Sequence, residues 1–168
     1  MTRDTYIRMT GATRRIASRL PGGAKALRLP TLVCAAVYIA ALFALMLARD
    51  MRLIRALLVP ACCFFVCTAL RALINRERPY DRFDVEPVGR FRPGKGKSMP
   101  SRHTASAAAI AFAILYLYPA PAVAAAMLLL CLLIAALRVL SGQHYPADVA
   151  AALALSAVLS LIGYTLPV

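Results

Sequence analysis

Charged residues, and acids above all, are scarce in this sequence. Only 16% of its 168 residues are charged, against about 25% in a typical soluble domain, while 61% are hydrophobic, against about 45–50%. The mean hydropathy is +0.70. This composition excludes an ordinary soluble domain, and it excludes low-complexity disorder, because disordered segments are poor in hydrophobic side chains. The length allows one domain, so we expect an integral membrane protein.

Acids are far outnumbered by bases, with seven Asp and Glu against 20 Lys and Arg, for a net charge of +13. Such an excess raises nucleic-acid binding as a possibility. However, apolar runs of bilayer length separate the basic residues, and residues 103–168 contain only two charged side chains, Arg138 and Asp148. A basic surface on a nucleic-acid-binding protein is not divided in this way, so we expect no nucleic-acid partner.

Cysteine pairs with metal-site or redox spacing are absent. The five cysteines all lie in apolar runs, and their odd number with no C-x-x-C spacing fits neither a disulfide scaffold nor a zinc site. We expect them to be small buried hydrophobic residues. They are Cys34, Cys62, Cys63, Cys67 and Cys131.

Five apolar runs approach the length of a membrane-spanning helix, which needs about 17–25 residues. They cover residues 31–48, 53–73, 104–120, 121–137 and 147–166. They predict an all-α fold, an integral membrane bundle of about five transmembrane helices within residues 30–168. Alanines spaced four apart, such as Ala105, Ala109 and Ala113, let such helices approach closely.

Residues 1–29 form a separate N-terminal segment that is basic and amphipathic. Its apolar residues at helical spacing are Met9, Ala12, Ile16 and Leu20, and Pro21-Gly22-Gly23 ends the pattern. Such a helix lies at the interface of an anionic membrane. A cleaved transit peptide has a similar composition.

The two histidines, together with Arg138 and Asp148, indicate where chemistry takes place. Charges near membrane spans are costly and mark functional sites. Pro146 suits the first position of a helix, which puts His144 just before that helix and Asp148 in its first turn. The carboxylate then favours one imidazole tautomer and makes the other ring nitrogen a better nucleophile or base.

A second group of polar residues precedes the third apolar run. Backbone N–H groups at a helix start, Ser101 and Arg102 together form an anion site, where His103 is placed as a proton donor. Arg71 and Arg78 close the second run. Arginines that converge near two histidines describe a phosphate pocket, because the guanidinium matches phosphate oxygens bidentately.

Each of these residues also has a simpler explanation. An interfacial Arg often anchors a helix by snorkelling, and Asp148 could serve only as a helix cap. Such explanations would require both histidines and both charged residues of the segment 103–168 to have no role in function. This coincidence favours the functional hypothesis.

The motifs follow one another in a characteristic order: Arg71-x6-Arg78-Pro79, Pro100-Ser101-x-His103, then Arg138-x5-His144-x3-Asp148. Over about residues 50–166 this resembles the type 2 phosphatidic acid phosphatase superfamily, whose signature is Lys-x6-Arg-Pro, Pro-Ser-Gly-His and Ser-Arg-x5-His-x3-Asp. Three positions depart from it. Arg71 replaces Lys, Arg102 replaces Gly, and Leu137 replaces the Ser before Arg138, which removes one phosphate hydrogen bond.

The resemblance implies a membrane enzyme that hydrolyses a lipid phosphate, of the phosphatidate, phosphatidylglycerophosphate or polyprenyl phosphate or diphosphate type. It implies that His144 forms a phosphohistidine, that Asp148 orients it, and that His103 protonates the leaving group. The phosphoryl oxygens would be held by Arg71, Arg78, Ser101, Arg102 and Arg138. No metal or cofactor is needed, because the arginines supply the charge that Mg²⁺ supplies elsewhere.

Two other functions remain open: a non-enzymatic membrane module that binds anionic lipids, and a transporter, although repeated halves are not visible. We expect a bacterial inner-membrane protein whose partners are membrane lipids and a lipid phosphate substrate. The positive-inside rule puts the active site in the cytoplasm. When the site arginines are left out, the basic residues of the 74–102 loop still outnumber those expected on the other side of the membrane. The loop contains Arg76, Arg82, Arg90, Arg92, Lys95 and Lys97, and the other side contains Arg49, Arg52 and Arg55.

Overall fold

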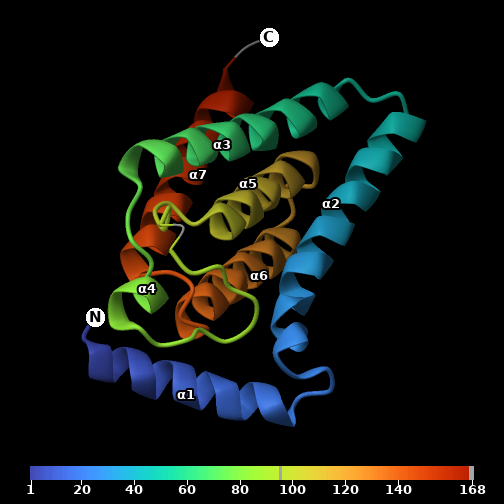
Figure 1. Ribbon diagram of the computed structural model, residues 1–168. Helices are drawn as coiled ribbons and strands as arrows, with labels where there is room; N and C mark the ends of the chain where they lie inside the picture. Colours follow the sequence, from blue (N-terminus) through green and yellow to red (C-terminus); the bar gives the residue numbers. More distant parts are fainter. Residues whose placement is uncertain (95, 167–168) are drawn as a thin grey trace.

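The computed structural model describes residues 1–94 and 96–166, and every regular element in these ranges is helical (Figure 1). The elements are α1 (Arg3–Arg19), the 3₁₀ helix η1 (Gly23–Arg28), α2 (Leu29–Leu47), α3 (Arg52–Ile74), α4 (Pro79–Phe83), α5 (Arg102–Leu117), α6 (Pro121–Leu140) and α7 (Pro146–Thr165). The predicted all-α fold is confirmed, with one long helix for each of the five apolar runs. Lys95, which was counted among the loop charges, lies outside the described residues.

Prolines set several helix boundaries. Pro121 and Pro146 each occupy the first position of a helix, where the missing N–H breaks no hydrogen bond. The helix predicted at 104–120 ends at Leu117, because the next residue, Tyr118, precedes Pro119 and is disfavoured from helical backbone.

Helix α5 is the centre of the bundle and packs against α2, α3, α6 and α7. Its 16 residues span about 24 Å, less than the ~30 Å of a bilayer core, whereas the other four long helices meet the length and hydropathy needed to cross. Ala105, Ala109 and Ala113 are buried in α5, as their spacing predicted. Because these four helices surround it, α5 is in contact mainly with other helices, whereas the outer helices also have faces directed towards lipid.

The outer helices direct large apolar side chains away from the bundle. Ile39, Phe65, Leu129 and Leu161 are each more than 60% exposed, as expected for surfaces that face lipid rather than water. Lipid-facing exposure also accounts for Cys62, the one cysteine of five that is not buried. The expectation that all five are buried was wrong for this residue.

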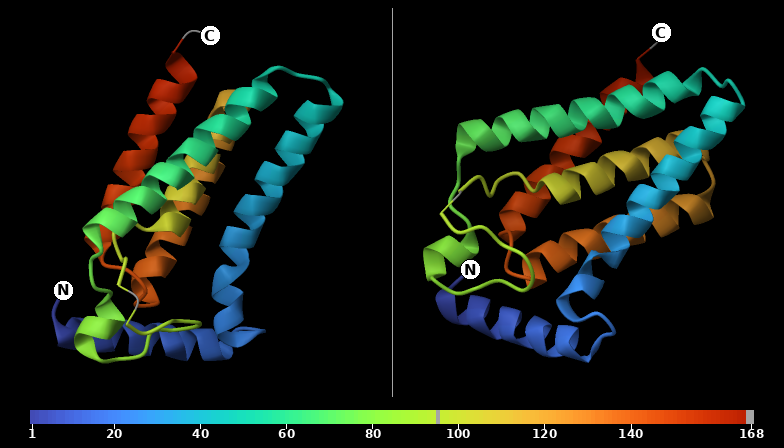
Figure 2. Two further views of the ribbon diagram at one scale, coloured as in Figure 1. Left: turned by 45° about the horizontal axis from the view of Figure 1, so that its top comes forward. Right: turned by 45° about the vertical axis from the view of Figure 1, so that its right-hand side comes forward.

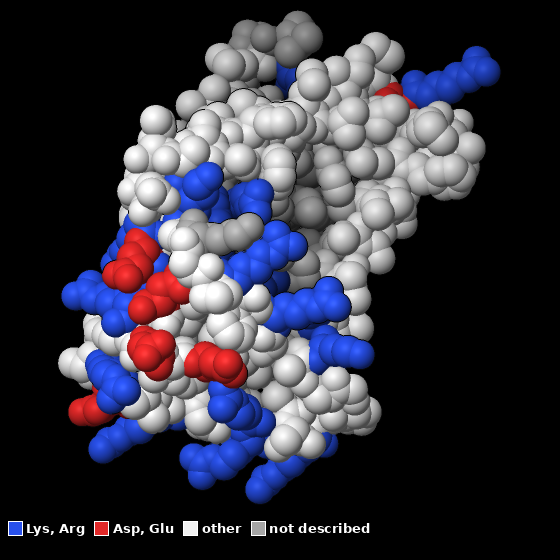
Figure 3. Space-filling model, viewed as in Figure 1, with Lys and Arg blue, Asp and Glu red and all other residues white. Residues whose placement is uncertain are grey.

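The long helices alternate in direction, so one end of the bundle collects several helix termini. The ends of α3 and α6 and the starts of α2, α5 and α7 all lie at the end that α1 crosses (Figure 2). Lys and Arg side chains gather over the same end, while a large part of the remaining face carries no charge (Figure 3). Most of the basic side chains on this face are therefore found at one end of an apolar bundle.

Helix α1 packs against this end through a face that the sequence did not predict. Its buried residues are Tyr6, Thr10, Thr13 and Ala17, whereas the predicted apolar stripe is exposed at Ala12, Ile16 and Leu20 and half-buried at Met9. The buried face is polar because it meets backbone carbonyls: the Thr13 hydroxyl donates to the Leu140 carbonyl at 2.9 Å. The apolar stripe is left for a surface outside the protein.

Tyr6 is the main contact between α1 and the loop that follows α6. Its hydroxyl oxygen lies 3.1 Å from the Gly142 carbonyl oxygen and 3.2 Å from that of Val85. Gly142 has a φ of +75°, and a Cβ there would come within 2.5 Å of the Tyr6 hydroxyl. Glycine is thus required both by the backbone conformation and by the tyrosine that packs on it.

We expect Tyr6→Phe to destabilise the protein by about 1–2 kcal/mol, because it leaves buried carbonyl oxygens without a donor. This corresponds to a fall of roughly 3–6 °C in apparent Tm, measured by thermal unfolding in detergent. Tyr118→Phe, in the exposed turn before α6, is the matched control and should leave Tm unchanged. Equal Tm values for the two variants would contradict the role given to the Tyr6 hydroxyl.

Candidate active site

All eight sequence-predicted site residues lie at the α1 end of the bundle. Arg71 and Arg138 come from the last turns of α3 and α6, and Arg78 immediately precedes α4. Ser101, Arg102 and His103 open α5; His144 and Asp148 lie at the start of α7. Helices that run in opposite directions bring these distant parts of the sequence together.

Asp148 is fully buried, and its carboxylate accepts from several donors. The Arg76 guanidinium donates to Oδ1 at 2.9 Å, while the Ser98 hydroxyl and the Tyr145 N–H donate to Oδ2. Its own carbonyl accepts the N–H of Ser101 at 3.0 Å. A buried carboxylate is tolerated only when it is paired and hydrogen-bonded in this way. The Asp148 carboxylate therefore ties α7 to the 74–102 loop, and the backbone carbonyl of Asp148 ties α7 to the start of α5.

His144 is buried beside this carboxylate. Its Nδ1 lies 3.5 Å from Asp148 Oδ2 and has no aligned hydrogen-bond partner among the described residues. A small rotation of the ring would complete the bond, and catalytic hydrogen bonds are often long before substrate binds. The orientation leaves Nε2 as the nitrogen that is not directed at Asp148.

Burial favours the neutral imidazole of His144 and lowers its pKa to about 4. The Asp148 carboxylate acts in the opposite direction, and Arg78 and Arg71 reinforce the decrease. His144 is thus uncharged near neutral pH, with a lone pair available on the ring.

Two of the site arginines are oriented by backbone carbonyls rather than by acids. Arg71, which is buried, donates to the Pro100 carbonyl at 2.9 Å. Arg78 donates to the carbonyls of Gly96 and Gln143 at 3.2 and 3.3 Å. The ion pairs found in the described part of the chain are Arg52–Asp50, Arg76–Asp148 and His144–Asp148, so no site arginine of the three motifs is paired with an acid there. Unneutralised guanidiniums in a cavity favour an anionic ligand.

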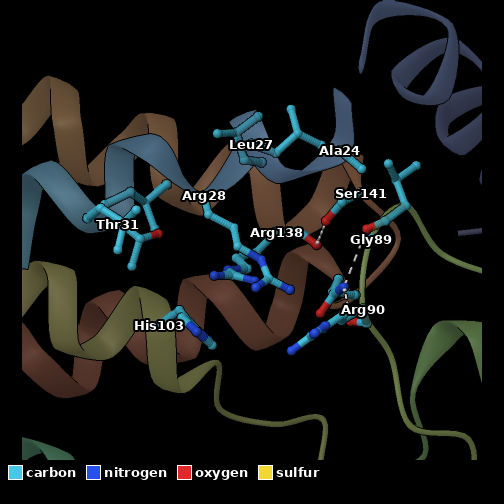
Figure 4. A pocket seen from close by; sticks show the side chains of 14 residues that line it. Ala24, Leu27, Arg28, Thr31, Gly89, Arg90, His103, Arg138 and Ser141 are labelled. Carbon is cyan, nitrogen blue, oxygen red and sulfur yellow. Dashed lines mark hydrogen bonds between the residues drawn. The ribbon is translucent and has the colours of Figure 1, made fainter. Parts of the chain in front are cut away.

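Three adjoining hollows divide the predicted residues. Arg71, Arg78 and Arg102 line a cavity of about 710 Å³. Arg138 and His103 line a second cavity of about 370 Å³ (Figure 4). His103 and Arg102 also border an apolar groove of about 370 Å³ between α2, α3 and α5. Ser101 and His144 line none of these hollows; both are buried next to them, and Thr104 donates to the Ser101 hydroxyl oxygen at 3.1 Å.

Sequence reasoning missed Arg76 and Ser98, which hold Asp148. In the sequence, Arg76 counts only as a loop charge for the positive-inside rule. In the structure Arg76 forms an ion pair with Asp148, and its guanidinium stacks over the Tyr145 ring, with Cζ 4.3 Å from the ring centroid. Neither residue belongs to a motif. The left-handed backbone of Asn75, which ends α3, redirects the chain so that Arg76 reaches the site. No local pattern in an arginine-rich loop distinguishes this arginine from its neighbours.

Across residues 1–94 and 96–166, no group of three or more His, Cys, Asp or Glu is placed to hold a metal ion.

Comparisons with known proteins agree with the geometry. The model of the PAP2 superfamily matches residues 52–168. Among solved structures, Aquifex aeolicus LpxE is similar with a TM-score of 0.74 and 21% identity over 97% of this chain and 94% of that one. The first transmembrane PAP2 type phosphatidylglycerolphosphate phosphatase from Bacillus subtilis is similar with a TM-score of 0.68 and 20% identity, over 95% and 83%. No curated protein sequence matches.

We expect His144 to titrate near pH 4 rather than near 6.5, because its burial penalises the charged ring. In the His103→Gln variant His144 is the only histidine, so its ¹³C shift in detergent micelles reports it alone. Since the unfolded chain binds the proton more readily, His144 should also reduce stability as the pH falls from about 6.5 towards 4. The same variant unfolded in denaturant is the control and should titrate near the ordinary value. A folded-state midpoint near 6.5 would refute the buried neutral ring.

Proposed function

The chain belongs to the PAP2 superfamily, and from this membership and the site geometry we propose that it is a membrane-embedded, metal-independent lipid phosphate phosphatase. The observation that supports this most directly is a buried His144–Asp148 pair at the end of the bundle that also carries four arginines with no acid partner in the described chain. This set of groups lies at one end of an apolar helical bundle, where a lipid headgroup meets water.

We propose that Nε2 of His144 is the nucleophile, because Nδ1 faces Asp148. Its lone pair attacks phosphorus, and the bond from phosphorus to the leaving oxygen breaks. His103 gives its proton to that oxygen, and Asp148 stabilises the charge that develops on His144. Water then attacks the phosphohistidine, neutral His103 accepts the water proton, and the N–P bond electrons return to Nε2.

The arginines act on the phosphoryl oxygens. Arg71, Arg78, Arg102 and Arg138 are proposed to surround the three equatorial oxygens, with a hydrogen bond from Ser101. Because carbonyls rather than carboxylates orient Arg71 and Arg78, their charges remain available to the substrate. Preorganised positive groups of this kind stabilise the transition state without reorganisation at the moment of reaction.

The apolar groove next to His103 supports a lipid substrate. Its walls include Cys34, Phe64, Ala107 and Ile110 from three helices, and none of these can hold a polar headgroup. A substrate whose phosphoryl group lies among the arginines could place its tail there, within the bilayer. The substrate classes consistent with this arrangement are phosphatidate, phosphatidylglycerophosphate, and polyprenyl phosphates or diphosphates; the name of the Bacillus subtilis relative lends support to the second.

The same proposal includes a role for residues 1–29 and the side of the membrane on which the active site lies. The exposed stripe at Ile16 and Leu20 suits a helix on the surface of the bacterial inner membrane. The positive-inside argument loses Arg76, which is paired. Arg82, Arg90, Arg92 and Lys97 in the described loop still favour a cytoplasmic active site.

We expect His144→Ala to lower phosphate release from a lipid phosphate by roughly a thousandfold, or about 4 kcal/mol of barrier, because a covalent catalyst is lost. The assay measures inorganic phosphate in mixed micelles with EDTA, which the wild type should tolerate. Acid-labile phosphate should be trapped on His144 of the wild type. Labelling on Ser or Asp, or full activity of the variant, would overturn the assignment; a lipid-binding module or transporter would release no phosphate at all.

The role of His103 can be separated from that of His144 by the leaving group. We expect His103→Ala to slow hydrolysis of a lipid alkyl phosphate about tenfold more than hydrolysis of an aryl phosphate, because an aryl oxide needs little protonation. The comparison uses kcat on both substrates, with His144→Ala as the control that should impair both alike. Equal losses in His103→Ala would show that His103 binds phosphate instead of donating a proton.

A further inference from the structure

Arg28 is a cation of the site that lies outside the three motifs and outside the residues matched by the family model. It is the last residue of η1 and immediately precedes α2. Its side chain points into the second cavity, where it lies next to Arg138 and faces the side on which His103 lies (Figure 4). The segment that precedes the matched region therefore supplies part of the site's wall.

The charges of this cavity are all of one sign. Arg28, Arg90 and Arg138 line it, together with His103, and none of its lining residues is acidic. Arg28 forms no ion pair with an acid in the described ranges. Two neighbouring guanidiniums with no acid between them repel one another, and an anionic group bound between them would relieve that repulsion, so the arrangement favours binding of an anion.

The position of His103 identifies which part of the substrate this is. His103 borders both this cavity and the apolar groove, and Thr31 is shared by the same two hollows. In the proposed reaction the leaving oxygen faces His103. The group attached to that oxygen must therefore lie where the Arg28 cavity and the groove meet.

We propose that Arg28, which lies next to Arg138, binds a second phosphate carried by the leaving group, and so selects lipids that have two phosphates over lipids with one. This inference rests on the proposed function. The class includes lipid diphosphates, in which the leaving group is a lipid monophosphate, and lipids in which a phosphodiester lies near the scissile phosphate. In both, the tail extends into the groove while the second phosphate meets the guanidiniums.

The experiment compares two substrates with one tail, farnesyl diphosphate and farnesyl phosphate, in micelles of an uncharged detergent. Arg28→Gln should lower the diphosphate-to-monophosphate ratio of kcat/KM by about tenfold to a hundredfold, through KM, because one charge-assisted contact is lost. Arg28→Lys should recover part of the ratio. Lys25→Gln, in the same 3₁₀ helix but outside the cavity lining, is the matched control and should leave the ratio unchanged.

Several results separate the outcomes. An unchanged ratio in Arg28→Gln, or equal losses on both substrates, would overturn the inference while the phosphatase assignment stands. If added phosphatidylglycerol changes the rates on both substrates alike, and only when Arg28 is present, Arg28 binds a neighbouring membrane lipid instead, which also overturns it.

If the wild type hydrolyses neither farnesyl substrate and also releases no phosphate from the lipid phosphates of the assay above, the proposed function fails, and binding of farnesyl methylenediphosphonate against farnesyl phosphonate still tests the site. Arg28→Gln should weaken the first about tenfold more than the second, measured as Kd by calorimetry. Equal Kd changes would exclude a site for a second phosphate.

Discussion

The Asp148 carboxylate is the group on which the rest of the site depends. A full negative charge at zero exposure is tolerated only because Arg76, Ser98 and the Tyr145 N–H converge on it. These partners come from the long loop and from the start of α7, and the Asp148 carbonyl adds the start of α5. Satisfying one carboxylate thus brings together the segments that carry the proposed phosphate-binding groups, and Nδ1 is the nitrogen of His144 that faces this carboxylate.

The arginines impose the opposite constraint. Arg71 is held by a carbonyl dipole, which orients the guanidinium without neutralising it. Like charges packed together at the end of an apolar bundle destabilise the empty protein, and the helices that position them must supply the compensating energy. In the proposed function, a bound phosphoryl group would relieve this repulsion, so stability and anion affinity are opposed in the same residues.

Sequence patterns predicted those features that depend on local chemistry. The five long helices follow from runs of apolar residues, and Pro121 and Pro146 set the starts of α6 and α7. The motif residues followed from order and spacing along the chain. What failed depends on contacts between distant segments: Arg76 is one arginine among many until Asn75 redirects the chain, and Arg28 reaches the site only through the path of η1. The buried face of α1 was mispredicted because its partners are backbone carbonyls, which favour Tyr6 and Thr13 over apolar residues.

The short central helix has a consequence for how substrate reaches the enzyme. Because α5 spans about 24 Å against ~30 Å of hydrocarbon, and the groove at its start is walled by α2 and α3, the reacting groups lie close to the plane of the lipid headgroups. A lipid substrate of the proposed kind would reach them by lateral diffusion, without leaving its leaflet. The relevant concentration would then be the mole fraction of substrate in the membrane surface, so that diluting the membrane with inert lipid would slow the proposed reaction even when the total amount of substrate is unchanged.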